Sequence, residues 1–331
     1  MGMLKQIRSQ NRAVFFLEKI LKSRELGHCY LFCGPQGVGK MSTAVLFAAS
    51  VLCQTPRGLW ACGSCATCRK IERGNYPYLR IVEPQGSTLG IGQVRQLKSF
   101  LTFKIEGNHF RFIIIDKAHN MTQEASNSLL KVLEEPPQRT CFILVADNID
   151  MVLPTIVSRS QIIPFTRIPQ GVVEEILREK GYSEEKIAAA ASIAHGSVGR
   201  ALELVEDEKL EAQRKMIVDF MESLPVSPGR VLEFALDLGS NFDVALTLEI
   251  ILSSYRSLLL KKITENGKQK EDESLFLDVE TLCIIIDRVI KAKKDLDDNA
   301  NKQLVLDTLL MDINEQVRIL KEGNYATGSW S

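Results

Sequence analysis

The sequence predicts an α/β fold in its first half and an all-helical second half. Apolar runs typical of buried strands alternate with helical patterns up to about residue 166, which predicts a parallel sheet covered by helices. After that point the strand patterns end. A glycine-rich loop at residues 34–41 joins the first strand to the first helix. With 331 residues, 45% of them hydrophobic and 25% charged, the chain has the composition of a soluble globular protein with two or three domains.

The first domain is expected to span residues 1–166. Apolar runs predict its strands at residues 30–33, 79–82, 112–115, 141–146 and 161–165. Helical patterns lie between them at residues 41–53, 91–101 and 122–133. Pro136 and Pro137 follow the last of these helices and are expected to stop it, because proline removes a helical hydrogen bond.

Two helical domains are expected to follow. Residues 167–208 predict a small helical domain whose helices are separated by Gly181 and Gly196. Residues 209–321 predict an all-α bundle with breaks at 225–228 and 264–274. Residues 322–331 have no periodicity, so we expect a disordered tail there.

The charge balance limits which partners the whole chain can attract. Lys plus Arg and Asp plus Glu both number 41, so the formal net charge is zero, and any contact with nucleic acid would require a local basic patch. No run approaches the ~18 apolar residues of a membrane span. We therefore expect a cytoplasmic protein that makes no membrane contact.

The loop at residues 34–41 (GPQGVGKM) matches the phosphate-binding pattern GxxxxGK[ST] except at its last position. Gly34, Gly37 and Gly39 would let backbone N–H groups approach phosphates, and Lys40 would reach them with its ammonium group. Met41 replaces the hydroxyl that normally ligates Mg²⁺, and a thioether is a poor ligand for that cation unless the next residue, Ser42, reaches it instead. ATP or ADP binding is therefore possible while hydrolysis is in doubt; a glycine-rich turn that binds nothing is the weaker alternative.

The strand at residues 112–115 ends in Asp116, as in the second nucleotide-binding motif, where the Asp approaches the bound Mg²⁺. In hydrolysing proteins of this class a Glu follows and activates water, but this chain has Lys117. A protonated lysine cannot serve as that general base near pH 7. The substitution argues against turnover; a surface Asp with no role is the plainer alternative for Asp116.

Four of the eight cysteines lie within sixteen residues: Cys53, Cys62, Cys65 and Cys68. Two overlapping CxxC steps and a fourth thiolate fit a closed tetrahedral Zn²⁺ site, which leaves no position open for catalysis. The sequence therefore predicts a structural zinc module at residues 53–68. Redox chemistry is the weaker alternative, because a thioredoxin-like CxxC does not require two further cysteines at metal spacing.

Arg159 stands between Ser158 and Ser160, just before the last predicted strand. Without further context, the simplest interpretation is that Arg159 places its positive charge at a helix C-terminus, where the helix dipole is negative. The alternative is an arginine finger, a guanidinium that projects into a neighbouring subunit's nucleotide site.

Residues 28–41, 112–138 and 153–165, together with the four cysteines, closely resemble clamp-loader subunits of bacterial DNA polymerase III. The resemblance covers about the first 205 residues. It implies an AAA+ module, made of the sheet domain and a helical lid, and a C-terminal collar domain within a ring of subunits. It also implies as partners the motor subunits gamma and tau and the subunit delta, with the sliding clamp and primer-template DNA contacted through the assembled complex.

Three positions favour a non-motor, delta prime type of subunit over gamma or tau. The motor subunits carry Ser or Thr, Glu, and a lid Arg where this chain has Met41, Lys117 and, in residues 196–202, an Arg200 that comes one position late. One position is about 100° around a helix. The resemblance thus implies little or no ATP hydrolysis by this chain and a role for Arg159 in trans.

Two other functions remain open from the sequence. The chain could be an active gamma- or tau-like motor in which Ser42 supplies the metal ligand and a carboxylate distant in the sequence orders the water. It could also be a nucleic-acid-binding zinc protein, but between the first and last of the four cysteines the basic and aromatic residues are only Arg57 and Trp60.

Overall fold

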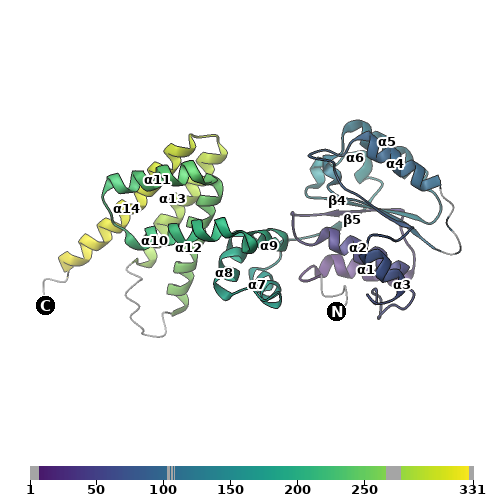
Figure 1. Ribbon diagram of the computed structural model, residues 1–331, viewed down its shortest axis with the longest axis horizontal. Coiled ribbons are helices and arrows are strands. Elements are labelled where there is room, and N and C mark those ends of the chain that lie inside the picture. Colours follow the sequence, from purple (N-terminus) through teal and green to yellow (C-terminus); the bar gives the residue numbers. More distant parts are fainter. Residues whose placement is uncertain (1–6, 103–104, 106, 108, 266–276, 328–331) are drawn as a thin grey trace. The chain divides into compact units, whose positions relative to one another are not determined.

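The computed structural model describes residues 7–102, 105, 107, 109–265 and 277–327 (Figure 1). The chain divides into two compact units. The first comprises Met1–Lys180 and Ala194–Ala201, and the second comprises Gly181–Ile193 and Leu202–Ser331. The predicted lid at residues 167–208 is shared between these units by its contacts, so its standing as a separate domain stays a prediction.

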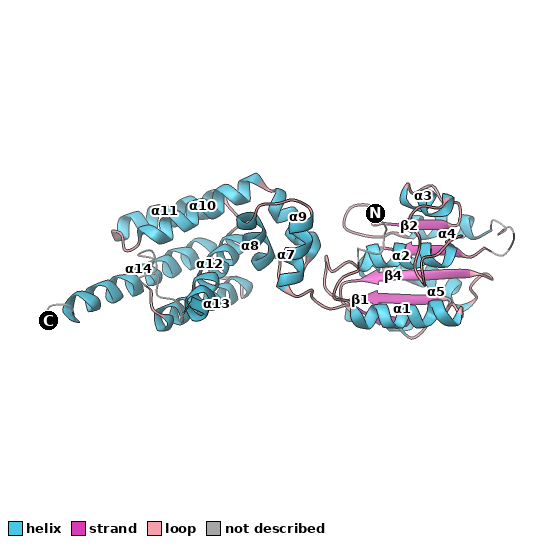
Figure 2. Ribbon diagram, turned by 90° about the horizontal axis from the view of Figure 1, so that it is seen from below, coloured by secondary structure: helices cyan, strands magenta, loops and turns pink. Residues whose placement is uncertain are grey.

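The first unit is built on a five-stranded sheet in the order β2-β3-β4-β1-β5, and every pair of neighbouring strands is parallel. Its strands are β1 (Cys29–Cys33), β2 (Leu79–Val82), β3 (Arg111–Ile115), β4 (Thr140–Ala146) and β5 (Gln161–Pro164). Figure 2 shows β1 and β4 side by side, with Leu31 opposite Leu144 in the register. The predicted parallel α/β class is confirmed.

Helices cover both faces of this sheet (Figure 1). On one face lie α1 (Asn11–Ser23), α2 (Lys40–Leu52) and α3 (Ala66–Glu72), and on the other lie α4 (Ile91–Thr102), α5 (Gln123–Glu134) and α6 (Pro154–Val157). Leu31 and Leu144 share a core with α4 to α6, whereas Tyr30 packs edge-on against Phe47 of α2. Because β1 and β4 are buried on both faces, they read as continuous apolar runs rather than alternating ones.

Short polar motifs fix the helix starts. The Thr122 side chain accepts the backbone N–H of Ala125 before α5, and Asp278 accepts that of Thr281 in the second unit. Such N-caps satisfy amide groups that have no partner inside a helix. The 3₁₀ turn η2 (Ala118–Asn120) follows β3, and a second one, η3 (Ile149–Met151), follows β4.

The helical elements after the sheet are α7 (Gln170–Glu179), α8 (Glu184–Ile193), α9 (Val198–Glu206), α10 (Glu208–Ser223), α11 (Pro228–Asn241), α12 (Val244–Glu265), α13 (Val279–Asp297) and α14 (Lys302–Thr327). One apolar core joins α8 and α10 to α14, with Ile193, Leu248 and Leu306 among its buried residues. Ile193 of α8 therefore packs with the bundle. Of the residues described, no helix is both long and apolar enough to cross a bilayer.

The prediction of a disordered tail is wrong for residues 322–327, because α14 continues to Thr327. Lack of apolar periodicity does not end a helix when no proline interrupts its hydrogen bonds. Residues 328–331 lie outside the described residues, as does most of the break predicted at 264–274.

Candidate nucleotide and metal sites

The glycine-rich loop connects the end of β1 to the start of α2, in the strand–loop–helix order that the sequence predicted. Gly34 has a φ of 151°, and a Cβ there would lie 2.2 Å from the Phe165 carbonyl oxygen. Gly37 and Gly39 also have positive φ angles, 75° and 94°. Only glycine adopts such conformations readily, so these residues shape the loop whether or not it holds a ligand.

Lys40 is turned inward against its own loop. It is only 4% exposed, and its Nζ donates to the carbonyl oxygens of Gly34 and Pro35, each at 2.6 Å, and to Asp147 Oδ1 at 2.8 Å. Asp116 was expected to approach the Mg²⁺ of a bound nucleotide, and no partner was predicted for Lys40; its ion pair is with Asp147. Asp147 directly follows β4, the strand beside β1. The sequence indicates that this residue follows a strand but not that the strand lies beside β1.

Asp116 and Lys117 follow β3, which is separated from β1 by β4. The Asp116 side chain accepts the backbone N–H of Lys117 at 2.9 Å. Lys117 has a φ of 47° and is exposed. The carboxylate is thus held by its own turn, and an ammonium group stands where the sequence argument required a water-activating carboxylate.

The start of α9 covers the tip of the loop. The backbone N–H of Gly199 donates to the Gly37 carbonyl oxygen at 3.1 Å, and a Cβ at Gly37 would lie 2.0 Å from the Ser197 hydroxyl oxygen. Arg200, one residue further, is exposed. Gly37 therefore also permits close approach of the residue 197–199 turn.

The four predicted metal ligands come together between α2 and α3. The Sγ atoms of Cys53, Cys62, Cys65 and Cys68 all lie within 4.8 Å of one another. The Cys53–Cys65 and Cys62–Cys68 sulfur distances are both 3.9 Å, and Cys53–Cys68 is 3.7 Å. A tetrahedron with Zn–S bonds of ~2.3 Å has S–S edges of about 3.8 Å. The four cysteines therefore fit one tetrahedral zinc ion.

Backbone N–H groups surround these sulfurs. Cys62 Sγ accepts the N–H groups of Ser64 and Cys65, and the Cys65 and Cys53 sulfurs accept those of Cys68 and Cys62. Burial raises the pKa of the Cys53 and Cys68 thiols, whereas a hydrogen bond from the Thr55 hydroxyl, with the N–H bonds, lowers the pKa of the Cys62 thiol to about 5. Such donors stabilise thiolates, the form in which cysteine binds metal.

The same module is tied to the neighbouring helices. The Trp60 indole is 7% exposed and donates to Glu18 of α1 at 3.2 Å, and the Ala61 N–H donates to the Ser50 hydroxyl of α2 at 2.9 Å. The cysteine module is therefore an insertion anchored on one face of the sheet.

Arg159 follows α6 and is held within its own chain. Its guanidinium donates to the Thr155 carbonyl oxygen at 3.2 Å and to Glu134 Oε1 at 3.0 Å. The side chains of Arg159 and Glu134 are 37% and 51% exposed. An exposed pair of this kind contributes ~1 kcal/mol or less, so it can be exchanged for a stronger anionic partner. No pattern in the sequence indicates that Glu134 pairs with Arg159.

Sequence reasoning also missed Gln10, which is 4% exposed. Its amide donates to the Thr166 carbonyl oxygen at 2.7 Å and accepts the Thr166 N–H at 3.0 Å, which ties the start of α1 to the end of the sheet domain. No periodicity or motif marks this residue in the sequence.

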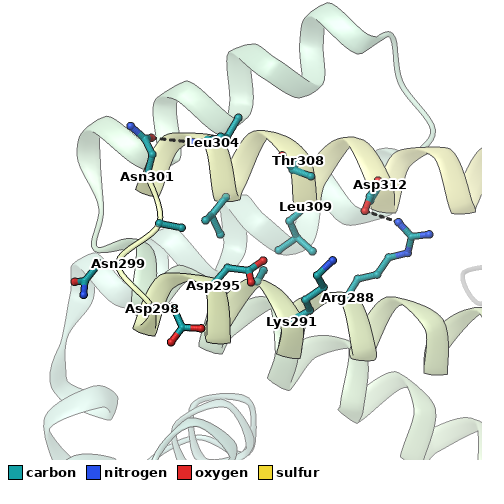
Figure 3. A pocket seen from close by; sticks show the side chains of 13 residues that line it. Arg288, Lys291, Asp295, Asp298, Asn299, Asn301, Leu304, Thr308, Leu309 and Asp312 are labelled. Carbon is teal, nitrogen blue, oxygen red and sulfur yellow. Dashed lines mark hydrogen bonds and ion pairs between the residues drawn. The ribbon is translucent and has the colours of Figure 1, made fainter.

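A pocket of about 580 Å³ in the second unit was likewise not predicted. It lies between α13 and α14, where Lys291 and Asp295 of α13 line it and an ion pair joins Arg288 to Asp312 (Figure 3). Its lining mixes both signs of charge, and we assign it no role.

Comparison with known proteins identifies the family. Residues 9–169 match the family model described as DNA polymerase III, delta subunit. The chain is 30% identical over 319 residues to the DNA polymerase III subunit delta' of Bacillus subtilis (strain 168), covering 92% of this chain and 96% of that protein. It is 36% identical over 134 residues to subunit delta' of Pseudomonas aeruginosa, covering 40% and 41%. It is also 32% identical over 196 residues to subunit tau of B. subtilis, covering 57% of this chain and 35% of tau. The resemblance inferred from the sequence is thereby confirmed: the chain belongs to the family of DNA polymerase III delta' subunits.

Proposed function

We propose that this chain is a non-motor subunit of the DNA polymerase III clamp loader. It occupies one place in a ring with the motor subunits gamma or tau and with delta, and the ring loads the sliding clamp onto primed DNA with ATP. The observation that carries the non-motor role is the pair of substitutions at its own P-loop site, Met41 and Lys117. In the assembled ring, Arg159 is proposed to act on the neighbouring motor subunit's ATP.

The zinc module has a structural role in this proposal. Four thiolates fill a tetrahedral ion and leave no open position for a substrate. The Trp60 and Ala61 hydrogen bonds fix the module on α1 and α2. It therefore stiffens the surface of the sheet domain beside the P-loop helix.

The isolated chain is expected to hydrolyse ATP negligibly. Loss of the metal-binding hydroxyl and of the water-activating carboxylate removes a factor of ~10² or more each from the rate. Phosphate release from the purified chain, with Lys40→Ala as control, measures this. Turnover near ~1 per second, in the usual range for enzymes, that Lys40→Ala abolishes would instead support a gamma- or tau-like motor.

We propose that the helices from residue 209 onward form the contacts with the other subunits of the ring. Leu232 and Leu236 lie one turn apart on α11 and are 44% and 58% exposed, an apolar stripe on a helix that otherwise closes the bundle core. Because Ile193 of α8 packs in that core, truncation near residue 206 would strip α8 of its partners, so point variants are the better test.

Leu236→Asp is expected to weaken co-assembly with the motor subunits and delta by ~10-fold or more, because a charge would enter a desolvated interface. Ser257→Asp, which adds the same charge at an exposed site of α12, is the matched control. Size-exclusion chromatography of equimolar mixtures measures both. Equal incorporation of the two variants would remove α11 from the proposed interface.

A further inference from the structure

The ammonium group of Lys40 has no donor left for a phosphate. A lysine ammonium carries three N–H donors and no acceptor. Here Nζ lies within hydrogen-bond distance of three oxygens, those of Gly34, Pro35 and Asp147, at 2.6, 2.6 and 2.8 Å. Two of these acceptors are neutral carbonyls of the loop itself, whereas Asp147 is a carboxylate and neutralises the charge of the lysine. A phosphate that binds the lysine must therefore first displace one of these three acceptors.

Asp147 is also held in place by its backbone. It leaves the carboxyl end of β4, which pairs with β1 immediately before the loop. Its N–H donates to His119 Nδ1 at 3.2 Å, and His119 Nε2 lies 3.6 Å from the second carboxylate oxygen. The carboxylate is therefore directed at Lys40 by two neighbouring elements, β4 and the η2 turn.

This placement discriminates between phosphates. In a P-loop the backbone N–H groups cradle the α- and β-phosphates, while the lysine reaches the β- and γ-phosphates. A carboxylate bound to the tip of that lysine opposes the γ-phosphate most strongly, because the two anions would compete for one ammonium group whose side chain is only 4% exposed. The α- and β-phosphates depend more on the loop N–H groups, which Asp147 does not occupy.

We propose that Asp147 is the counter-ion of the P-loop lysine and sets the ligand preference of this site, disfavouring a nucleoside triphosphate and leaving a nucleoside diphosphate as the preferred ligand. Asp147 is thus a specificity-determining residue. The inference concerns the same P-loop as the proposed non-motor function, but it predicts binding in the ground state rather than hydrolysis, so the two can fail separately.

The test is calorimetric titration of the full chain with Mg²⁺-ADP and Mg²⁺-ATP. The wild type is expected to bind ADP more tightly than ATP. Asp147→Asn, which keeps the side-chain shape and removes the charge, is expected to strengthen ATP binding by ~10-fold or more, with a smaller effect on ADP. Asp147→Ser is a second neutral variant, and thermal melting verifies that each variant is folded.

Asp150→Asn is the matched control, because it removes an exposed carboxylate three positions away and changes the net charge equally. Four results would overturn the proposal: wild-type preference for ATP, unchanged ATP affinity in both Asp147 variants, an equal gain in Asp150→Asn, or no nucleotide binding by any form. Hydrolysis measured in the same samples bears on the non-motor role alone.

Discussion

Replacing Arg159 with alanine is expected to lower the stimulated ATPase rate and the clamp-loading rate of the assembled complex by ~10-fold or more. A guanidinium that stabilises developing charge on a transferred phosphoryl group contributes ~10³ to 10⁵ in GTPases, and a smaller factor is expected where several sites share turnover. Arg159→Lys should also be impaired, because an ammonium lacks the planar fork that contacts two oxygens at once. The measurement is ATP hydrolysis and clamp loading by complexes reconstituted with clamp and primed DNA.

Glu134→Gln is the informative control for this experiment. It removes the charge partner of Arg159 at 3.0 Å but leaves the guanidinium in place, so the complex should retain its activity. Assembly and zinc content of each complex exclude indirect effects. If a fully assembled Arg159→Ala complex hydrolyses ATP and loads clamps at the normal rate, Arg159 has no role in trans and its contact with Thr155 near the end of α6 is structural.

Replacing Cys65 with serine is expected to abolish stoichiometric zinc binding and to loosen residues 53–68 while the sheet stays folded. Zinc binding contributes ~10–16 kcal/mol to folding in isolated zinc-finger peptides, and that energy stabilises mainly the segment that its ligands connect. Elemental analysis of anaerobically purified protein measures the metal. Trp60 reports the local change, because its buried indole would become exposed and its emission would shift to the red.

Two further substitutions serve as controls for the fluorescence and metal measurements. Trp330→Phe removes the second of the two tryptophans, which lies outside the described residues. Cys283→Ser alters an exposed cysteine of α13 and should leave both metal and emission unchanged. Absence of stoichiometric metal from the unaltered protein would refute the zinc site outright.

The sheet was predictable because strands buried on both faces leave uninterrupted apolar runs, as at residues 141–146, and because prolines and glycines mark their ends. The metal ligands were predictable because four cysteines close together in the chain must also be close in space. Asp147 was not, since its role depends on β4 lying beside β1, an adjacency that no local pattern specifies. Glu134 and Arg159 likewise meet only because α5 packs against α6. The extent of α14 was missed because periodicity reports burial and not helix formation itself.

The strand order has a consequence for synthesis on the ribosome. β1 lies near the start of the chain, directly before the P-loop. It pairs with β4 (Thr140–Ala146) and β5 (Gln161–Pro164) and with neither of the two strands that follow it directly in sequence. At ~5–20 residues per second, many seconds pass between emergence of β1 and emergence of its partners. During that interval Tyr30, Leu31 and Phe32, all fully buried in the finished sheet, have no strand to pair with. The strand order therefore leaves an apolar segment without its strand partners, and so prone to aggregation, until residue 164 has left the exit tunnel.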